Sequence, residues 1–196
     1  MTWLVAGLGN PGPSYARTRH NAGAMVVEAM AEAAGERFRK RRFIAVEVAE
    51  IRDPEAGELL VLARPATFMN LCGPPLASLA RKIRVGVDRV IACHDEIDLP
   101  FGSLQVKQGG STAGHQGLNS MVGAFRSRDF YRVRLGVGRP PGRQNPADYV
   151  LELFSPRERT EVEVLVQEAT DAVRSLVRDG LAVTQDRYNR GGGRRK

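Results

Sequence analysis

The chain has 196 residues, of which 42% are apolar, and its 29 Lys and Arg against 22 Asp and Glu give a net charge of +7. This length suits one well-buried core and is short for two, so a single domain is expected. No apolar run approaches the roughly 18 residues of a membrane span, and no basic residue precedes the first apolar run, which argues against a signal peptide. The basic balance favours a polyanionic partner, above all a nucleic acid.

The two cysteines, Cys72 and Cys93, lie in apolar surroundings and show neither CxxC nor CxxH spacing. This pattern is typical of buried, reduced thiols rather than of disulfides or metal ligands. Structural disulfides are rare in the cytoplasm, which is the location that we expect for this protein.

The first half of the chain predicts a strand, a helix, a hairpin and a second helix. Residues 2–7 form the expected strand, and residues 23–34 have the periodicity of an amphipathic helix. RFIAVEVAEI and LLVLA, separated by the turn residues DPEAG, predict an antiparallel hairpin. The second helix is expected to begin at the proline pair of GPPLASLARKIRV, because proline is tolerated in a first turn.

The second half predicts two strands and two helices. DRVIACHDEID indicates a buried strand that runs into an acidic loop, HQGLNSMVGAF a helix, and FYRVRLGVG another strand. The last helix is expected to begin at a capping box of Ser155 and Glu158, with Pro156 at its first position, and to end at Gly180. Because strands and helices alternate, the expected class is α/β, a single three-layer domain with a mostly parallel mixed sheet flanked by helices.

Two basic stretches stand outside this pattern, RFRKRR at residues 37–42 and RGGGRRK at residues 190–196. Runs of like charge are usually solvated faces or disordered ends, and contact of either stretch with RNA is left open. The three glycines of the second stretch would make any such contact electrostatic and independent of sequence. We expect a folded domain over residues 1–188 and a flexible basic tail over residues 189–196.

The loop after the first strand contains Gly7-x-Gly9-x-x-Gly12, which is the spacing of a dinucleotide-binding loop. The context does not support that interpretation. Pro11 lacks a backbone N–H and Pro13 follows it, so two donors that would hold a pyrophosphate are missing. The nearest acid at the required distance, Glu28, falls inside a helix, and we therefore expect no cofactor.

Three histidines, His20, His94 and His115, lie in polar or glycine-bearing segments and are the candidate bases for proton transfer. A histidine that only satisfies loop backbone groups is the alternative for each. His94 also opens the acidic run HDEID, but alternate residues after a strand point to opposite sides and no HxH or HExxH spacing occurs. We expect no metal site.

A serine nucleophile is not indicated either, because GxSxG is absent and Ser111 in GGSTAG lacks a strand-to-helix elbow. The chain does offer histidine, aspartate and several carboxamides in predicted turns. That set suits general-base activation of water, with neutral donors available for an oxyanion.

Four segments, GLGNPGPSYARTRHNAG, RPATFMNLCG, HDEIDLPFGSLQVKQGG and GHQGLNS, closely resemble the bacterial peptidyl-tRNA hydrolase family in their order and separations. The resemblance covers nearly the whole chain, including FYRVRLGVGRP, YVLELF and the terminal RYN. It implies a catalytic domain in residues 1–188 that acts in translation as a cytoplasmic monomer without a cofactor. The family cleaves the ester that joins a peptide to the terminal ribose of tRNA and so releases the tRNA.

The resemblance also implies roles for individual residues. His20 of TRHN is the general base that takes a proton from the attacking water, and Asp95 of HDE holds that imidazole in one tautomer and favours its protonated form. Asn10 and Asn70 hold the peptide and the ester through carboxamide hydrogen bonds. Because a free ammonium could not make the same bonds, we also expect this pair to recognise the first peptide amide.

Further contacts follow from the same resemblance. Tyr15 and Met69 are expected to pack on the substrate. Lys107 in VKQGG and Arg134 in RVRLG match positions that grip a tRNA phosphate, which basic side chains can do without reading bases. On its own pattern, Arg134 is simply an outward position of an alternating strand.

Gln116 departs from the family pattern, because GHQGL stands where the family usually has GHNGL. Glutamine keeps the carboxamide that holds water and the end of the substrate but adds a methylene, which shifts the hydrogen-bonding atoms of a positioned site. We predict an active enzyme whose rate the longer side chain can lower.

Two other functions are compatible with the sequence. One is a non-catalytic RNA-binding protein on the same fold, which only Gln116 favours, and the other is an esterase for small acylated compounds, which would not need the basic surface. Loss of turnover as salt rises would distinguish an RNA substrate from a small ester, because phosphate contacts release counterions.

Overall fold

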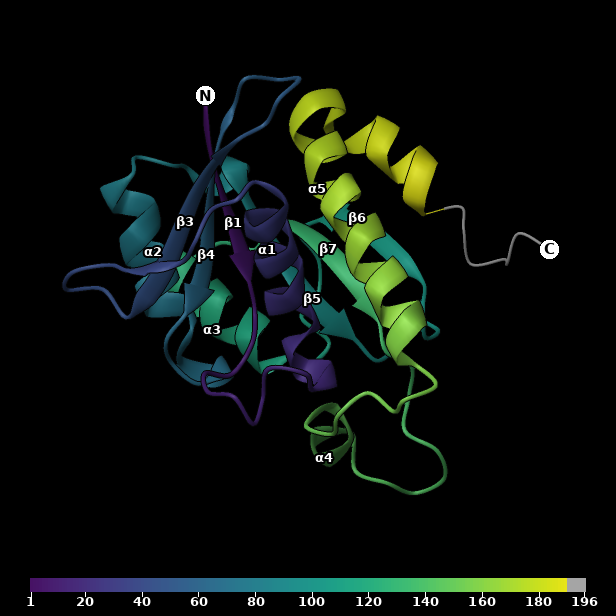
Figure 1. The fold of residues 1–196 in the computed structure, drawn as a ribbon. Helices are drawn as coiled ribbons and strands as arrows, with labels where there is room; N and C mark the ends of the chain where they lie inside the picture. The colour runs from purple at the N-terminus through teal and green to yellow at the C-terminus, as the bar shows by residue number, and fades with distance from the viewer. Residues whose placement is uncertain (190–196) are drawn as a thin grey trace.

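The computed structural model describes residues 1–189. Its centre is a seven-stranded sheet with the strand order β2-β3-β4-β1-β5-β7-β6 (Figure 1). The four central strands β4, β1, β5 and β7 are parallel, and β3, β2 and β6 join antiparallel at the two sides. The strands are β1 (Thr2–Gly7), β2 (Arg39–Lys40), β3 (Val46–Arg52), β4 (Leu59–Pro65), β5 (Val90–Glu96), β6 (Leu104–Gln108) and β7 (Tyr131–Gly136).

Helices cover both faces of the sheet, with α1 and α5 on one face and α2 and α3 on the other (Figure 1). The α-helices are α1 (Ala22–Ala33), α2 (Gly73–Lys82), α3 (Gln116–Phe125), α4 (Pro146–Val150) and α5 (Arg159–Tyr188). Three single-turn 3₁₀ helices are η1 (Arg19–Asn21), η2 (Met69–Leu71) and η3 (Val87–Arg89). The predicted single three-layer α/β domain is confirmed.

Each central strand is apolar on both faces because each face packs under helices. On β1, Val5 contributes to the core beneath α1 and α5, while Leu4 and Ala6 contribute to the core beneath α2 and α3. Cys72 and Cys93 lie in these two cores as buried free thiols. Burial raises the pKa of each thiol to about 12, so both remain protonated near neutral pH.

The prediction for the last helix is wrong about its start but right about Gly180, where the first helical segment ends. Residues 156–158 form a turn in which the Glu158 carboxylate accepts from the Ser155 N–H at 2.6 Å, and α5 begins only at Arg159. Gly180 interrupts the helix with φ 78° and ψ 177°, but the helix resumes and runs to Tyr188. The Thr184 hydroxyl donates to the Gly180 carbonyl and lies 3.0 Å from the Ser175 hydroxyl, which holds the second segment against the first.

Three elements were not predicted: β2, β6 and α4. The basic residues 37–42 include β2, where Arg39 and Lys40 are exposed and pair with β3 at the edge of the sheet. At the opposite edge, β6 is held by Asn189, whose side chain bonds to both the N–H and the carbonyl of Val106. Asn189, the first residue of the predicted tail, is thus attached to the domain. Residues 190–196 lie outside the described part of the chain.

None of the helices in the described residues combines the length and the apolar character that crossing a membrane requires.

Candidate active site

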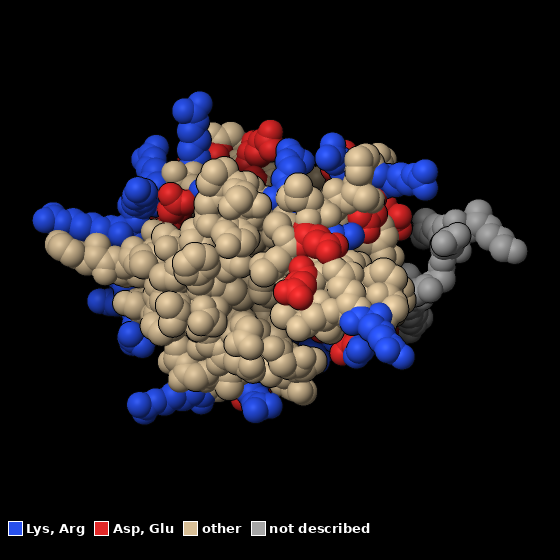
Figure 2. Space-filling model, turned by 90° about the horizontal axis from the view of Figure 1, so that it is seen from below, with Lys and Arg blue, Asp and Glu red and all other residues tan. Residues whose placement is uncertain are grey.

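A cleft with a volume of about 900 Å³ opens at the carboxyl ends of the parallel strands, where ligands of α/β sheets usually bind. Figure 2 views this end of the molecule, and much of the middle of the face carries no charged side chain, while Lys and Arg lie around its margin. All the predicted catalytic and substrate-contacting residues line this cleft: Asn10, Tyr15, His20, Met69, Asn70, Asp95 and Gln116.

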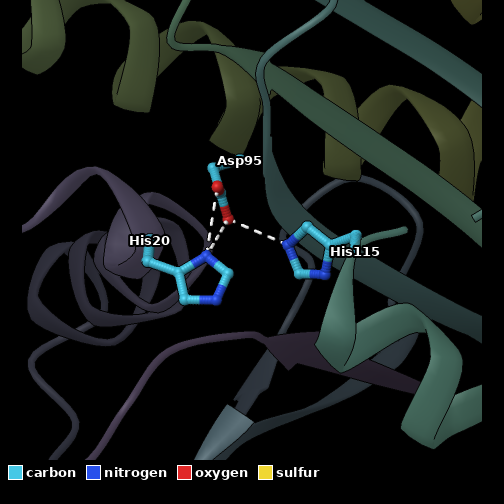
Figure 3. Close-up of side chains that lie close together, drawn as sticks. All are labelled: His20, Asp95 and His115. Carbon is cyan, nitrogen blue, oxygen red and sulfur yellow. Dashed lines mark hydrogen bonds and ion pairs between the residues drawn. The ribbon is translucent and has the colours of Figure 1, made fainter. Parts of the chain in front are cut away.

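His20 and Asp95 meet at the floor of the cleft, although 75 residues separate them in the chain. The His20 Nδ1 atom lies 3.0 Å and 3.1 Å from the two carboxylate oxygens of Asp95 (Figure 3). The other ring nitrogen, Nε2, points away from Asp95. His20 sits on η1 directly before α1, and Asp95 lies near the end of β5, so two neighbouring elements of the fold hold the pair.

Asp95 controls the protonation of His20. Burial alone would lower the pKa of His20, but the charge of Asp95 and its hydrogen bond outweigh burial and raise that pKa above 6.5. Burial raises the pKa of Asp95, but the two histidines beside the carboxylate outweigh burial and bring that pKa far below its usual range. The carboxylate is therefore ionised and ready to stabilise an imidazolium.

His115 is the second partner of Asp95, at 2.9 Å from Nε2 to Oδ1 (Figure 3). Its Nδ1 atom accepts from the backbone N–H groups of Gly117 and Leu118, so His115 caps the N-terminus of α3. Because Nδ1 accepts, the proton of the neutral ring resides on Nε2 and is donated to Asp95. The sequence indicated His115 only as one of three candidate bases, inside the predicted helix, and not as a cap or a partner of Asp95; its position at the predicted helix start was the available signal.

Alternation along β5 points His94 to the other side of the strand from Asp95, and His94 does not line the cleft. The ring is fully buried, its Nδ1 lies 2.7 Å from the Asp95 carbonyl oxygen, and it packs edge-on against His115 with 4.9 Å between ring centres. Burial, and then the proximity of His115, lower the pKa of His94 well below 6.5. His94 is therefore a neutral packing partner rather than a base in the cleft.

The acidic run after β5 does not converge on one point. The side chains of Glu96 and Asp98 pair with Arg134 and Arg139, respectively. His20, Asp95 and His115 do come together, with one potential ligand atom of each within 4.8 Å of the others. The ring nitrogens of the two histidines lie at hydrogen-bonding distances from the Asp95 oxygens, as N–H donors do. The expectation that no metal is needed stays a prediction.

The glycine-rich loop after β1 positions Asn10. The Asn10 side-chain oxygen accepts from the Met69 N–H at 2.8 Å, and its backbone N–H and carbonyl pair with the side chain of Asn21. A Cβ on Gly9 would lie 2.9 Å from the Asn21 amide, so glycine is required for this contact. Gly12 turns the chain with φ 102°. Asn21 was not predicted, although it directly follows His20 in the TRHN motif.

The rest of the cleft combines apolar and carboxamide side chains. Tyr15 packs edge-on against Phe68 with 6.2 Å between ring centres, and the neighbouring Met69 is buried. Asn70 and Gln116 are exposed at the cleft surface. Such a lining offers packing area together with neutral donors and acceptors, which suits a peptide.

Lys107 and Arg134 lie outside the cleft, on β6 and β7. The Arg134 side chain is only 14% exposed and pairs with Glu96 at 2.8 Å, so it is not the outward cation that strand alternation predicts. Partial burial, followed by repulsion from Arg134 and Arg132, lowers the pKa of Lys107. Contact of this pair with a phosphate remains a prediction.

Arg19, next to the candidate base, fastens η1 to the segment before α5. Its guanidinium is 7% exposed, donates to the Leu153 carbonyl at 2.8 Å and makes two 3.0 Å bonds to the Glu158 carboxylate. It also lies 4.4 Å from the ring centre of Tyr149. The backbone supports the same junction, because the Arg19 N–H donates to the carbonyl of residue 152.

Replacing Arg19 with methionine is expected to lower the free energy of unfolding by about 2–3 kcal/mol, because Glu158 would keep a partly buried charge without its partner. The whole difference in unfolding free energy between the wild type and this variant should be present at pH 7. Burial raises the pKa of Glu158, but its bonds to Ser155 and its interaction with Arg19 outweigh burial and bring that pKa below 4.5. The stability that the ion pair contributes is therefore lost only as pH falls below 4.5. Urea unfolding at several pH values measures it, with exposed Arg157→Met as the control; equal stability of both variants would contradict the assignment.

A sequence model of the family described as peptidyl-tRNA hydrolase matches residues 4–196. The chain belongs to the peptidyl-tRNA hydrolase family. It is 51% identical over 187 residues to the peptidyl-tRNA hydrolase of Frankia alni, covering 95% of this chain and 93% of that one. It is 47% identical over 186 residues to the enzyme of Nocardia farcinica, with 95% of both chains covered.

A solved peptidyl-tRNA hydrolase has the same fold. The crystal structure of the enzyme from Acinetobacter baumannii superimposes with a TM-score of 0.87 at 28% identity, covering 94% of this chain and 93% of that one. The predicted family, the fold class and the assignment as a hydrolase of this family are therefore confirmed.

Proposed function

We propose that this enzyme hydrolyses the ester bond between a peptide and the terminal ribose of tRNA, with a water molecule that His20 activates. The observation that carries the mechanism is the orientation of His20: Nδ1 is held by Asp95 while Nε2 is directed away from it, on a residue that lines the cleft. A histidine oriented in this way can accept a proton from water and pass it on.

The reaction would proceed in two proton transfers. His20 Nε2 takes a proton from water as the oxygen attacks the ester carbonyl, which leaves an imidazolium beside ionised Asp95 and a negative charge on the carbonyl oxygen. The C–O bond to the ribose then breaks, and the imidazolium returns its proton to the ribose oxygen. The products are a peptide with a free carboxylate and a tRNA with a free terminal hydroxyl.

Asn10 defines part of the peptide site. Because its side-chain oxygen already accepts from the Met69 N–H, the NH₂ group is the part of the Asn10 side chain that has no partner among the described residues and that a substrate can use. This donor suits a peptide carbonyl or the oxyanion, so discrimination between a peptide amide and a free ammonium is assigned to Asn70, which is exposed at the cleft and is free to present its oxygen.

The substrate class is tested with an N-acylated aminoacyl-tRNA beside its unacylated counterpart, at rising salt. Cleavage of the acylated ester alone, with kcat/KM falling as salt rises, is the expected result, because bound phosphates release counterions. Cleavage of small acyl esters at a salt-independent rate would instead identify a general esterase. Binding of tRNA without turnover would identify a non-catalytic RNA-binding relative.

Gln116→Asn is expected to change kcat by less than about tenfold, since one methylene alters the position but not the chemistry of the carboxamide. The side chain is exposed at the surface of the cleft, where it has room to adjust. Steady-state hydrolysis of an N-acylated aminoacyl-tRNA measures the change, and Gln116→Ala separates loss of the amide from its displacement. Equal rates for the alanine variant and the wild type would remove Gln116 from the site.

A further inference from the structure

Arg132 is a fully buried cation without an acidic partner. It lies on β7 between β5 and β6 and its exposure is 0%; among residues 1–189 it forms no ion pair, and the only carboxylate that attracts it from further away is that of Glu96. Buried arginines are normally paired with acids, since an uncompensated charge is costly to remove from water. Its neighbours make this worse: Lys107 is directly opposite on β6, and Arg134 is two residues away on the same face. A role beyond packing is needed to explain this arginine.

The two Nη atoms of the guanidinium both bond to one turn of the backbone, while the group also lies 5.1 Å from the ring centre of Phe130. Nη1 donates to the Ser111 carbonyl at 2.6 Å and Nη2 donates to the Gly110 carbonyl at 3.0 Å. Gly109 and Gly110 have φ angles of 65° and 88°, so the chain leaves β6 in a conformation that gives its carbonyls no strand partner. Arg132 supplies the donors that the sheet does not.

That turn leads directly to the catalytic carboxylate. Five residues after Gly110, His115 donates to Asp95, and the His115 N–H closes a tight turn on the Thr112 carbonyl at 2.9 Å. The segment between the two anchor points, Thr112 to Gly114, lines the cleft. The segment is therefore fixed at one end by Arg132 and at the other by the His115–Asp95 bond.

We propose that Arg132 is a positioning residue for the hydrolysis, which holds the Gly110–Ser111 turn so that His115 keeps its hydrogen bond to Asp95. The proposal rests on the proposed function of His20 and Asp95. It also places the turn beside the predicted phosphate contact, because a Cβ on Gly110 would lie 3.2 Å from the Lys107 ammonium. The turn held by Arg132 thus connects the predicted phosphate contact at Lys107 with the pair of His20 and Asp95.

The test uses Arg132→Met, which keeps an unbranched apolar stem of similar shape and removes both donors to the turn. The expected result is a fall in kcat of about 10- to 100-fold, with KM nearly unchanged, because a small displacement of a catalytic group has effects of this size. The acid limb of the pH profile should move to higher pH: without the His115 donor, the negative charge of Asp95 acts on His20 alone. Arg132→Lys, which retains the charge and one donor, should recover part of the rate.

A double-mutant cycle with His115→Asn distinguishes positioning from mere stability. Asparagine can still cap α3 but is too short to reach Asp95. If Arg132 acts through His115, adding Arg132→Met to His115→Asn should not lower kcat further. Additive losses, or an unmoved pH profile in both Arg132 variants, would overturn the proposal. So would a change confined to KM and its salt dependence, which would make Arg132 an RNA contact. Arg128→Met, at an exposed position before β7, is the control for lost charge, and thermal unfolding monitors folding.

Discussion

His20→Asn is expected to lower kcat for an N-acylated aminoacyl-tRNA by about 10²- to 10⁴-fold, the usual contribution of a general base. Asparagine suits this test because its NH₂ group can replace Nδ1–H as the donor to Asp95, while nothing replaces Nε2. The carboxylate therefore keeps a partner, and the folded structure loses only the proton acceptor that faces away from it. Steady-state kinetics measure the loss.

Binding of uncharged tRNA provides the control for His20→Asn. The dissociation constant should match that of the wild type, because the phosphate contacts predicted for Lys107 and Arg134 lie outside the cleft. Loss of turnover with unchanged binding is the signature of a lost base. Turnover within threefold of the wild type would disprove the assignment of His20, whereas loss of both binding and folding would show that the substitution acted on the structure.

The sequence predicts the layers of this fold well because local periodicity and global packing agree. The apolar run of β5, VIAC, is buried on both faces. The acidic residues that follow it lie at the carboxyl end of the strand, where Asp95 lines the cleft. What spacing could not show is that His20 would lie within 3.0 Å of Asp95. That convergence depends on β1 and β5 being neighbours, and only the resemblance to the family anticipated it.

The residues that were missed depend on contacts that have no local pattern. The capping role of His115 was not predicted because an imidazole is not among the usual helix caps. The burial of Arg132 and Arg134 was missed for a different reason. Strand β6 was not predicted, so the alternating pattern of β7 indicated a strand at the edge of the sheet with one solvated face. In the structure β7 pairs with β5 and β6, and β6 brings Lys107 close to the two arginines.

At Gly180 the local rule predicts the break in the helix correctly but not the helical segment that follows it. A glycine with positive φ is the usual end of a helix, and it does break α5. The helix resumes because the following segment reaches back to the domain: the Gln185 side chain and Asn189 both bond to Val106 on β6. Tertiary contacts thus decide where the chain stops being helical.

Asp95→Asn is expected to lower kcat by about 10²- to 10⁴-fold and to move the acid limb of the kcat/KM profile to lower pH. In the wild type, burial lowers the pKa of His20 and Asp95 raises it above 6.5. Removing the charge leaves burial unopposed, so the imidazole of the variant should titrate below 6.5. The rate falls because the amide cannot stabilise the imidazolium and no longer selects the tautomer with a free Nε2.

The direction in which the acid limb moves decides the matter, because it is opposite to the direction expected when His115 loses its bond to Asp95. Asp95→Asn withdraws negative charge from His20, whereas His115→Asn leaves more of that charge to His20, which pairs with the same carboxylate at 3.0 Å. Profiles of kcat/KM between pH 5 and 9 for the two variants should therefore move to opposite sides of the wild type. Shifts in the same direction would mean that the two histidines do not compete for one carboxylate, and the proposed division of roles around Asp95 would fail.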